Sequence, residues 1–374
     1  MKNTGAIQVA LDQAVLDGVF PGGVLVARVH GQLQLLVTAG RLSAEPGAEA
    51  VRNSTIYDLA SLTKPLATVT SVLLLVQAGK LELDAAVGGI LTELKESPIG
   101  AATLRDLLCH RSGLPGWRPL YERLHAEGVA WGSADPEVVR QTVLRLVSAE
   151  PLAYELGQQH LYSDLGFILL GMAVERASGL LLDEYFDMAV VQPLGGQSLY
   201  FNRTAKASRP PSTRFGGSIA ATEWDDWRKR LLKGEVHDEN AAAMGGVAGH
   251  AGLFGTAQGV LAVSGAWLKG LQGTPSTLDR HLVREFTKRQ PRPSGSSWAL
   301  GWDTPSTPSS SGTYFSAESF GHLGFTGTSL WIDPQRSLEV VLLTNRVHPS
   351  RKNDAIRAFR PMIHDLVYRE FALP

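Results

Sequence analysis

Two hairpin-like segments at opposite ends of this 374-residue chain constrain its fold more than any other feature. Near the N-terminus, residues 24–37 form two apolar runs around His30-Gly31, a pair typical of a two-residue hairpin turn. Near the C-terminus, residues 329–343 form two more runs around a four-residue turn. Helical patterns predominate between about 61 and 176. An antiparallel sheet built from distant parts of the chain would accommodate both ends.

The predicted fold is therefore α+β, with an antiparallel sheet flanked by an N-terminal and a C-terminal helix. The first helix, within 1–16, is apolar on one side at Ile7, Leu11, Ala14 and Val15, and the last spans about 353–371. We expect a discontinuous sheet domain from 1–60 and 250–374, interrupted by a mostly helical domain from 61–249. The active site is expected at the seam between them.

Composition excludes several classes of function. The net charge is -1, so the chain lacks the basic excess that neutralises phosphates, and no nucleic-acid partner is expected. The single cysteine, Cys109, excludes an intrachain disulfide and a multi-cysteine zinc cluster.

The most apolar run, 66–76, is too short to span a bilayer, so no membrane span is predicted. The first 16 residues lack a secretory pattern, which predicts a cytoplasmic protein. The oligomeric state is left open.

Ser61 and Lys64 form a compact candidate for nucleophile and base. Positions i and i+3 share one helix face, and a serine hydroxyl needs a neighbouring base. Pro65 is tolerated only in a first helical turn, which places Ser61 at the N-terminus of an apolar helix that Gly79 ends. Taken alone, a serine before a helix is usually just an N-cap.

Several motifs in order resemble one family. The stretches 56–64 (IYDLASLTK), 81–87 (LELDAAV) and 103–115 (TLRDLLCHRSGLP) resemble the serine β-lactamase and penicillin-binding superfamily, in its class C β-lactamase and D,D-peptidase branch. Residues 162–164 (YSD) resemble its Tyr-x-Asn element, and 322–324 (HLG) resemble its Lys-Thr-Gly strand motif in the histidine form. The segments 219–223, 234–240 and 245–254 are similar to a subgroup that includes penicillin-binding carboxypeptidases.

The resemblance implies a role for each matching residue. Ser61 would attack a carbonyl and form an acyl-enzyme, with Lys64 or Tyr162 as the general base. The backbone N–H groups of Ser61 and Phe325 would form the oxyanion hole. Gly324 would let the substrate backbone lie flat against the strand.

Asp164 and His322 depart from the family pattern. Asp164 stands where asparagine is usual, and an ionised carboxylate beside Lys64 raises the pKa of the lysine. This shifts the role of base toward Tyr162. His322 replaces a permanent charge with a side chain that is mostly neutral near pH 7, so we expect a weaker grip on a substrate carboxylate and only weak β-lactamase activity.

His237, Asp238 and His250 invite a metal interpretation. Their spacing fits no short ligand motif, and glycines around His250 suggest tight turns, so no metal or cofactor is predicted. We expect His250 at the rim of the pocket, while the roles of His237 and Asp238 stay open.

The favoured function is a serine hydrolase that forms an acyl-serine, resembles a D,D-peptidase or amidase, and acts on peptidoglycan-type peptides. Its substrate would be a small molecule or a short peptide. Two alternatives remain. One is a cytoplasmic carboxylesterase of the same fold, which His322 and the lack of a visible leader would suit. The other is a non-catalytic penicillin-binding-like protein, which does not require Ser61, Lys64 and Tyr162 together.

Overall fold

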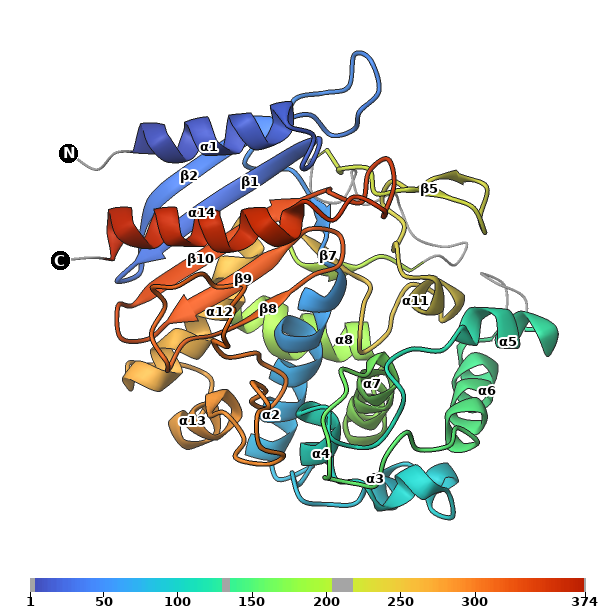
Figure 1. Ribbon diagram of the computed structural model, residues 1–374. Coiled ribbons are helices and arrows are strands. Elements are labelled where there is room, and N and C mark those ends of the chain that lie inside the picture. The colour runs from blue at the N-terminus through green and yellow to red at the C-terminus, as the bar shows by residue number, and fades with distance from the viewer. Residues whose placement is uncertain (1–3, 130–134, 204–217, 373–374) are drawn as a thin grey trace.

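The protein is described here by a computed structural model covering residues 4–129, 135–203 and 218–372 (Figure 1). Its main sheet has five antiparallel strands in the order β2-β1-β10-β9-β8. These strands are β1 (Gly22–Val29), β2 (Gln32–Gly40), β8 (Phe320–Leu323), β9 (Ser329–Asp333) and β10 (Leu338–Thr344). Both predicted hairpins are confirmed, and β1 of the first pairs with β10 of the second, for example Val26 with Val341.

The two residues at the turn of the first hairpin both adopt a left-handed backbone conformation. His30 has φ 49° and Gly31 has φ 75°, the combination that a type I′ turn requires. The second hairpin joins β9 to β10 with Leu338 opposite Asp333.

Alternating side chains bury both faces of the sheet. On one face, Leu25 and Leu342 join a core with α1 (Thr4–Leu16) and α14 (Ile356–Phe371), which lie side by side across the sheet in Figure 1. On the other face, Val24 and Leu343 join a larger core that includes α12 (Ala257–Gln272) and the helical middle of the chain. The α+β fold with flanking terminal helices is confirmed. The proposed domain boundaries stay a prediction.

The remaining elements surround this sheet. The helices are α2 (Thr70–Gln77), α3 (Val87–Ile90), α4 (Leu104–Leu108), α5 (Leu120–Ala126), α6 (Pro136–Ser148), α7 (Asp164–Ser178), α8 (Leu182–Phe186), α9 (Gln192–Leu194), α11 (Glu239–Ala243) and α13 (Arg280–Thr287). Short strands are β3 (Tyr57–Asp58), β4 (Tyr200–Phe201), β5 (Trp224–Asp225), β6 (Arg230–Leu231) and β7 (Leu253–Gly255), with β7 between β3 and β4.

The segment carrying Ser61 is helical, but it is not the single α-helix that the sequence predicts. A 3₁₀ turn (Ala60–Leu62) leads into a π-helical segment (Lys64–Val69) and only then into α2, which ends before Gly79 at φ 67°. Single π-helical turns inside helices are frequent at functional sites, because they re-aim side chains. Within the described residues, the stretch Ala60–Gln77 is apolar enough to cross a membrane, as is a bent pair formed by Asp164–Ser178 and Leu182–Leu194. The Ala60–Gln77 window is 78% buried within the protein, as a core helix would be.

Candidate active site

Ser61 lies at a strained turn between β3 and the buried helix. Ala60, directly before it, has φ 47°, a left-handed conformation that is costly for a residue with a Cβ. The buried carboxylate of Asp58 accepts the Ala60 N–H at 2.8 Å and so holds this conformation. The strain therefore fixes the position of the serine rather than leaving it on a mobile loop.

Four oxygen atoms surround the amine of Lys64. Its Nζ lies 3.0 Å from Ser61 Oγ, 3.1 Å from the His250 carbonyl oxygen and 2.7 Å from Asp164 Oδ1, and the Tyr162 hydroxyl also bonds to it. The lysine side chain is fully buried. Burial disfavours the ammonium, but the Asp164 carboxylate and Tyr162 outweigh it and raise the pKa of Lys64. Lys64 is therefore an ammonium at neutral pH.

Tyr162 stands just before α7 with its hydroxyl bonded to Lys64 and Ser61. The Lys64 Nζ lies 4.8 Å from the centre of the Tyr162 ring. Burial raises the pKa of Tyr162, although the Lys64 cation opposes that shift. The resting site thus holds a neutral phenol beside an ammonium, and this pair must lose one proton before it can take one from Ser61.

Asp164 is the first residue of α7, and Ser163 caps this helix by accepting the Gly166 N–H at 3.2 Å. The cap turns the chain so that Tyr162 and Asp164 approach Lys64 together. The prediction that a carboxylate here raises the pKa of the lysine agrees with the geometry.

The strand motif is attached directly to the chain that precedes Ser61. Thr326 Oγ1 donates to the Asp58 carbonyl at 2.7 Å, and Thr328 Oγ1 donates to the Leu59 carbonyl at 3.0 Å. A Cβ on Gly324 would lie 2.6 Å from the same Leu59 carbonyl, so only glycine fits. Among the described residues, the Phe325 N–H donates to no internal acceptor. It is therefore available to a ligand, as an oxyanion donor must be.

His322 is buried and neutral. Its Nδ1 lies 2.7 Å from the Leu323 carbonyl, an acceptor, so Nδ1 carries the proton and the neutral ring presents Nε2 as an acceptor. Burial and the nearby Lys64 cation lower the pKa of His322 to about 3. The buried Nε2 bonds to none of the described residues. In this state His322 accepts a hydrogen bond and does not attract a carboxylate.

The two other candidate histidines have structural partners. His250 Nε2 lies 2.8 Å from Asp238, and His237 Nε2 lies 2.8 Å from Glu223. His250 is not the exposed rim residue that the sequence predicts: it is 1% exposed, its ring bonds to Asp238, and its carbonyl accepts from Lys64. Across 4–129, 135–203 and 218–372, no group of three or more His, Cys, Asp or Glu side chains is arranged to hold a metal ion.

Sequence reasoning missed an aromatic wall behind Tyr162. The His110 ring lies 4.6 Å from the Tyr162 ring and 4.5 Å from the Trp298 ring, and the Trp298 ring lies 5.6 Å from that of His322. His110 Nδ1 also accepts the Ser163 N–H at 3.1 Å, so the histidine contacts both the Tyr162 ring and the backbone of the next residue in the motif. His110 falls inside the family-like stretch 103–115, but no spacing rule links it to residue 162.

Sequence reasoning also missed the support of the exposed Phe325 ring. Phe325 is 49% exposed and packs on His237, with ring centres 5.7 Å apart, while the Arg346 guanidinium lies 4.4 Å from the centre of the Phe325 ring. Glu223 holds His237 and also accepts from Arg351. These contacts join segments that lie far apart in the sequence.

Comparison with known proteins places this geometry in context. The family model described as Beta-lactamase matches residues 7–360. A protein of Salmonella agona (strain SL483) named "Putative D-alanyl-D-alanine carboxypeptidase" is 32% identical over 324 residues, which cover 81% of this chain and 72% of the relative. A protein of the same name from Salmonella schwarzengrund (strain CVM19633) is 33% identical over equal coverage.

Solved structures share the fold at lower identity. EstCE1, described as a hydrolase with promiscuous acyltransferase activity, aligns with a TM-score of 0.75 at 21% identity, over 97% of this chain and 98% of its own. A penicillin-binding protein homologue from Caulobacter crescentus aligns with a TM-score of 0.72 at 18% identity, over 98% and 97% of the two chains.

Proposed function

The chain belongs to the Beta-lactamase family, and on this premise we propose that it is a serine hydrolase that acts through an acyl-enzyme on Ser61. The contact that carries the proposal is the 3.0 Å approach of Lys64 Nζ to Ser61 Oγ, with the Tyr162 hydroxyl bonded to both. A helix cap requires only the serine, whereas this arrangement also supplies a route for its proton.

The proposed reaction begins when the Lys64–Tyr162 pair loses one proton to solvent. Ser61 then gives its proton to the pair as Oγ attacks the substrate carbonyl, and the Phe325 and Ser61 N–H groups hold the developing oxyanion. One such donor contributes roughly 3 kcal/mol to transition-state stabilisation. The pair returns the proton to the leaving group, and water repeats the sequence to release the acyl group.

We propose short peptides of the D-Ala-D-Ala type as the first substrate class, because relatives at 32% identity carry a carboxypeptidase name. Neutral esters are the second candidate, and a specific observation favours them. The neutral His322 offers a substrate carboxylate no positive charge, so a substrate without a carboxylate loses nothing there. Cytoplasmic localisation stays a prediction, which cell fractionation would test.

Intact-mass labelling tests the chemistry. The protein is incubated separately with a fluorescent penicillin, a p-nitrophenyl ester and a D-Ala-D-Ala peptide. Ser61→Ala is the test variant, and Ser54→Ala, on an exposed loop nearby, is the matched control. We expect an acyl adduct or turnover that Ser61→Ala abolishes and Ser54→Ala retains. If all three compounds give neither labelling nor turnover, the result would favour the non-catalytic penicillin-binding-like alternative.

A further inference from the structure

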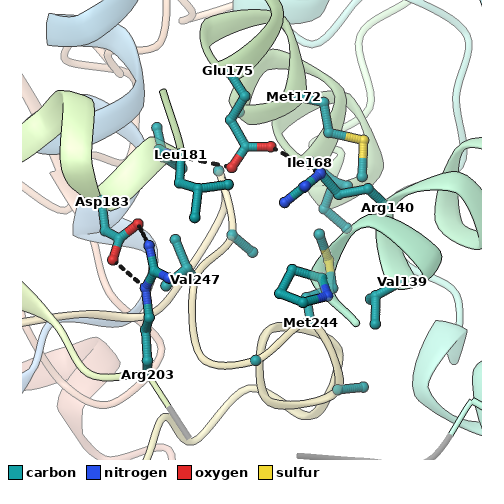
Figure 2. Close-up of a pocket in the computed structure, with 17 residues that line it drawn as sticks. Val139, Arg140, Ile168, Met172, Glu175, Leu181, Asp183, Arg203, Met244 and Val247 are labelled. Carbon is teal, nitrogen blue, oxygen red and sulfur yellow. Dashed lines mark hydrogen bonds and ion pairs between the residues drawn. The ribbon is translucent and has the colours of Figure 1, made fainter. Parts of the chain in front are cut away.

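A cavity of about 110 Å³ lies along α7 (Figure 2), and Ser61 is not among the residues that line it. One face of α7 supplies Ile168, Met172 and Glu175, and α6 supplies Val139. The segment 243–249 closes the other side with Met244 and Val247. None of the predicted substrate-binding or catalytic residues lines it.

The interior of this cavity is apolar and adaptable. In Figure 2, the side chains of Ile168, Met172, Met244 and Val247 surround a common space. Methionine is unbranched and fills or opens irregular gaps readily. For scale, an apolar cavity of ~150 Å³ in another protein stays dry and binds benzene. The size therefore suits one ring or a short aliphatic chain.

The charges at its edge are already paired. The Arg203 guanidinium donates twice to Asp183 at 2.6 Å, and Arg140 lies 2.7 Å from Glu137. Glu175 Oε1 accepts the Leu182 N–H at 3.0 Å. Because these partners compensate one another, a charged ligand would have to break an existing pair. A neutral ligand would not.

We propose that this cavity is a binding site, separate from Ser61 and the residues around it, for a small neutral apolar molecule of single-ring size. The site does not depend on the proposed hydrolase activity. Its position nevertheless links it to Lys64. Gly249 lines the cavity and its carbonyl accepts from Thr68 at 2.6 Å, while the next carbonyl, that of His250, accepts from Lys64. A displacement of Gly249 at the cavity wall would therefore also displace the carbonyl that accepts from Lys64.

Methionine-methyl NMR with toluene as the probe tests the site. Met172 and Met244 line the cavity, whereas Met188 and Met362 are 51% and 46% exposed elsewhere and act as internal controls. We expect toluene to shift the Met172 and Met244 methyl resonances in a saturable manner and leave the other two unchanged. Single Met→Leu variants assign the resonances. If neither cavity methyl moves up to the solubility limit of toluene, there is no such site.

A matched pair of variants locates the binding. Val247→Phe fills the cavity, and Val138→Phe places the same change at a 52% exposed position on α6. We expect the shifts to disappear in Val247→Phe and to persist in Val138→Phe. Shifts that persist in a folded Val247→Phe variant would overturn the assignment.

The rate of Ser61 acylation by a p-nitrophenyl ester measures the link to Lys64, and this readout alone rests on the proposed function. We expect toluene to change that rate at least threefold in the wild type and not in Val247→Phe. An unchanged rate with clear methyl shifts would overturn the link but not the site. A change that persists in Val247→Phe would show that toluene acts on the rate without entering the cavity, which would overturn the link. A protein that is never acylated contradicts the proposed function, while the methyl shifts still decide the site.

Discussion

The Oδ1 atom of Asp164 lies 2.7 Å from the Nζ atom of Lys64, which has no exposed surface. Burial of Lys64 alone would favour the neutral amine that a general base needs. Asp164 and Tyr162 reverse that effect and raise the pKa of the lysine. Lys64 is thus held in its protonated form, and the proposed reaction must begin by removing a proton from the pair that it forms with Tyr162.

We expect Asp164→Asn to move acylation to lower pH. Loss of the carboxylate lowers the pKa of Lys64, because burial still disfavours the ammonium. The alkaline rise of kcat/KM for a p-nitrophenyl ester should therefore shift downward, with a gain of ~10-fold at pH 7. Profiles from pH 6 to 10 measure it, with Ser61→Ala as the blank and the exposed Asp226→Asn as control. A slower variant at every pH would show that the carboxylate itself takes part in proton transfer.

The KM for a substrate that bears a carboxylate should be constant between pH 5 and 8. The pKa of His322 is lowered to about 3, so the ring stays neutral throughout that window and its affinity for the anion does not change. Initial rates with a D-Ala-D-Ala peptide at fixed ionic strength provide the measurement. A KM that rises severalfold with a midpoint near pH 6.5 would mean that His322 titrates normally and binds the carboxylate as a cation.

Gly324→Ala should destabilise the protein by ~2 kcal/mol and abolish acylation. The new Cβ would meet the Thr328 hydroxyl and the Leu59 carbonyl, so the strand motif must move away from Ser61. Gly89→Ala is the matched control, because a Cβ there contacts nothing within 4 Å. Urea unfolding and ester kinetics measure both effects. An active Gly324→Ala variant of normal stability would contradict this packing.

His110→Asn should lower kcat by ~10-fold while KM changes little. Asparagine tolerates the left-handed backbone at φ 58° and keeps an acceptor for the Ser163 N–H, but it removes the ring that packs on Tyr162. His110 is a positioning residue in this interpretation. His110→Phe, which keeps a ring, should retain more of kcat than His110→Asn. An increase in KM alone would instead place His110 in substrate binding.

Glu223→Gln should cost about 2 kcal/mol of unfolding free energy at pH 7. Bonds from His237 and Arg351 lower the pKa of Glu223 from 4.5 to about 2, against the opposing effect of burial. The carboxylate therefore contributes stability above pH 4.5, which is lost as pH falls toward 2.

Unfolding curves between pH 2 and 7 test this, and the acid-induced decline should be shallower in Glu223→Gln than in the wild type. Glu96→Gln, at an exposed position, serves as the control. If both variants follow the wild-type curve, the buried Glu223 network contributes nothing measurable to stability.

Local patterns predicted the parts of the fold that depend on local chemistry. The His30-Gly31 turn, the apolar spacing at Ile7 and Leu11, and the C-terminal helix all follow from neighbouring residues. The π-helical turn after Thr63 does not, because it depends on how Lys64 and Thr68 bond to His250 and Gly249, some 180 residues away.

The candidate site likewise has parts that the sequence motifs predict and parts that depend on tertiary contacts. The order of the motifs predicted that Ser61, Lys64, Tyr162 and Asp164 come together, and the contacts between their side chains agree with that prediction. The sequence did not predict the aromatic wall behind Tyr162 or the contacts that support Phe325. They are tertiary contacts of ordinary residue types, and a single sequence carries no signal for the distance between two rings.

The pairing of β1 with β10 has a consequence for biosynthesis. Strand β1 pairs with Val341 and Leu342 of β10, which are synthesised about 315 residues after it. Gly324 and Phe325 are made only shortly before β10. Before those residues are made, the nascent chain lacks both the proposed oxyanion donor at Phe325 and the threonines that hold the turn before Ser61. Ser61, the proposed nucleophile, is therefore synthesised long before the residues that complete its surroundings, and any reactivity must wait for them.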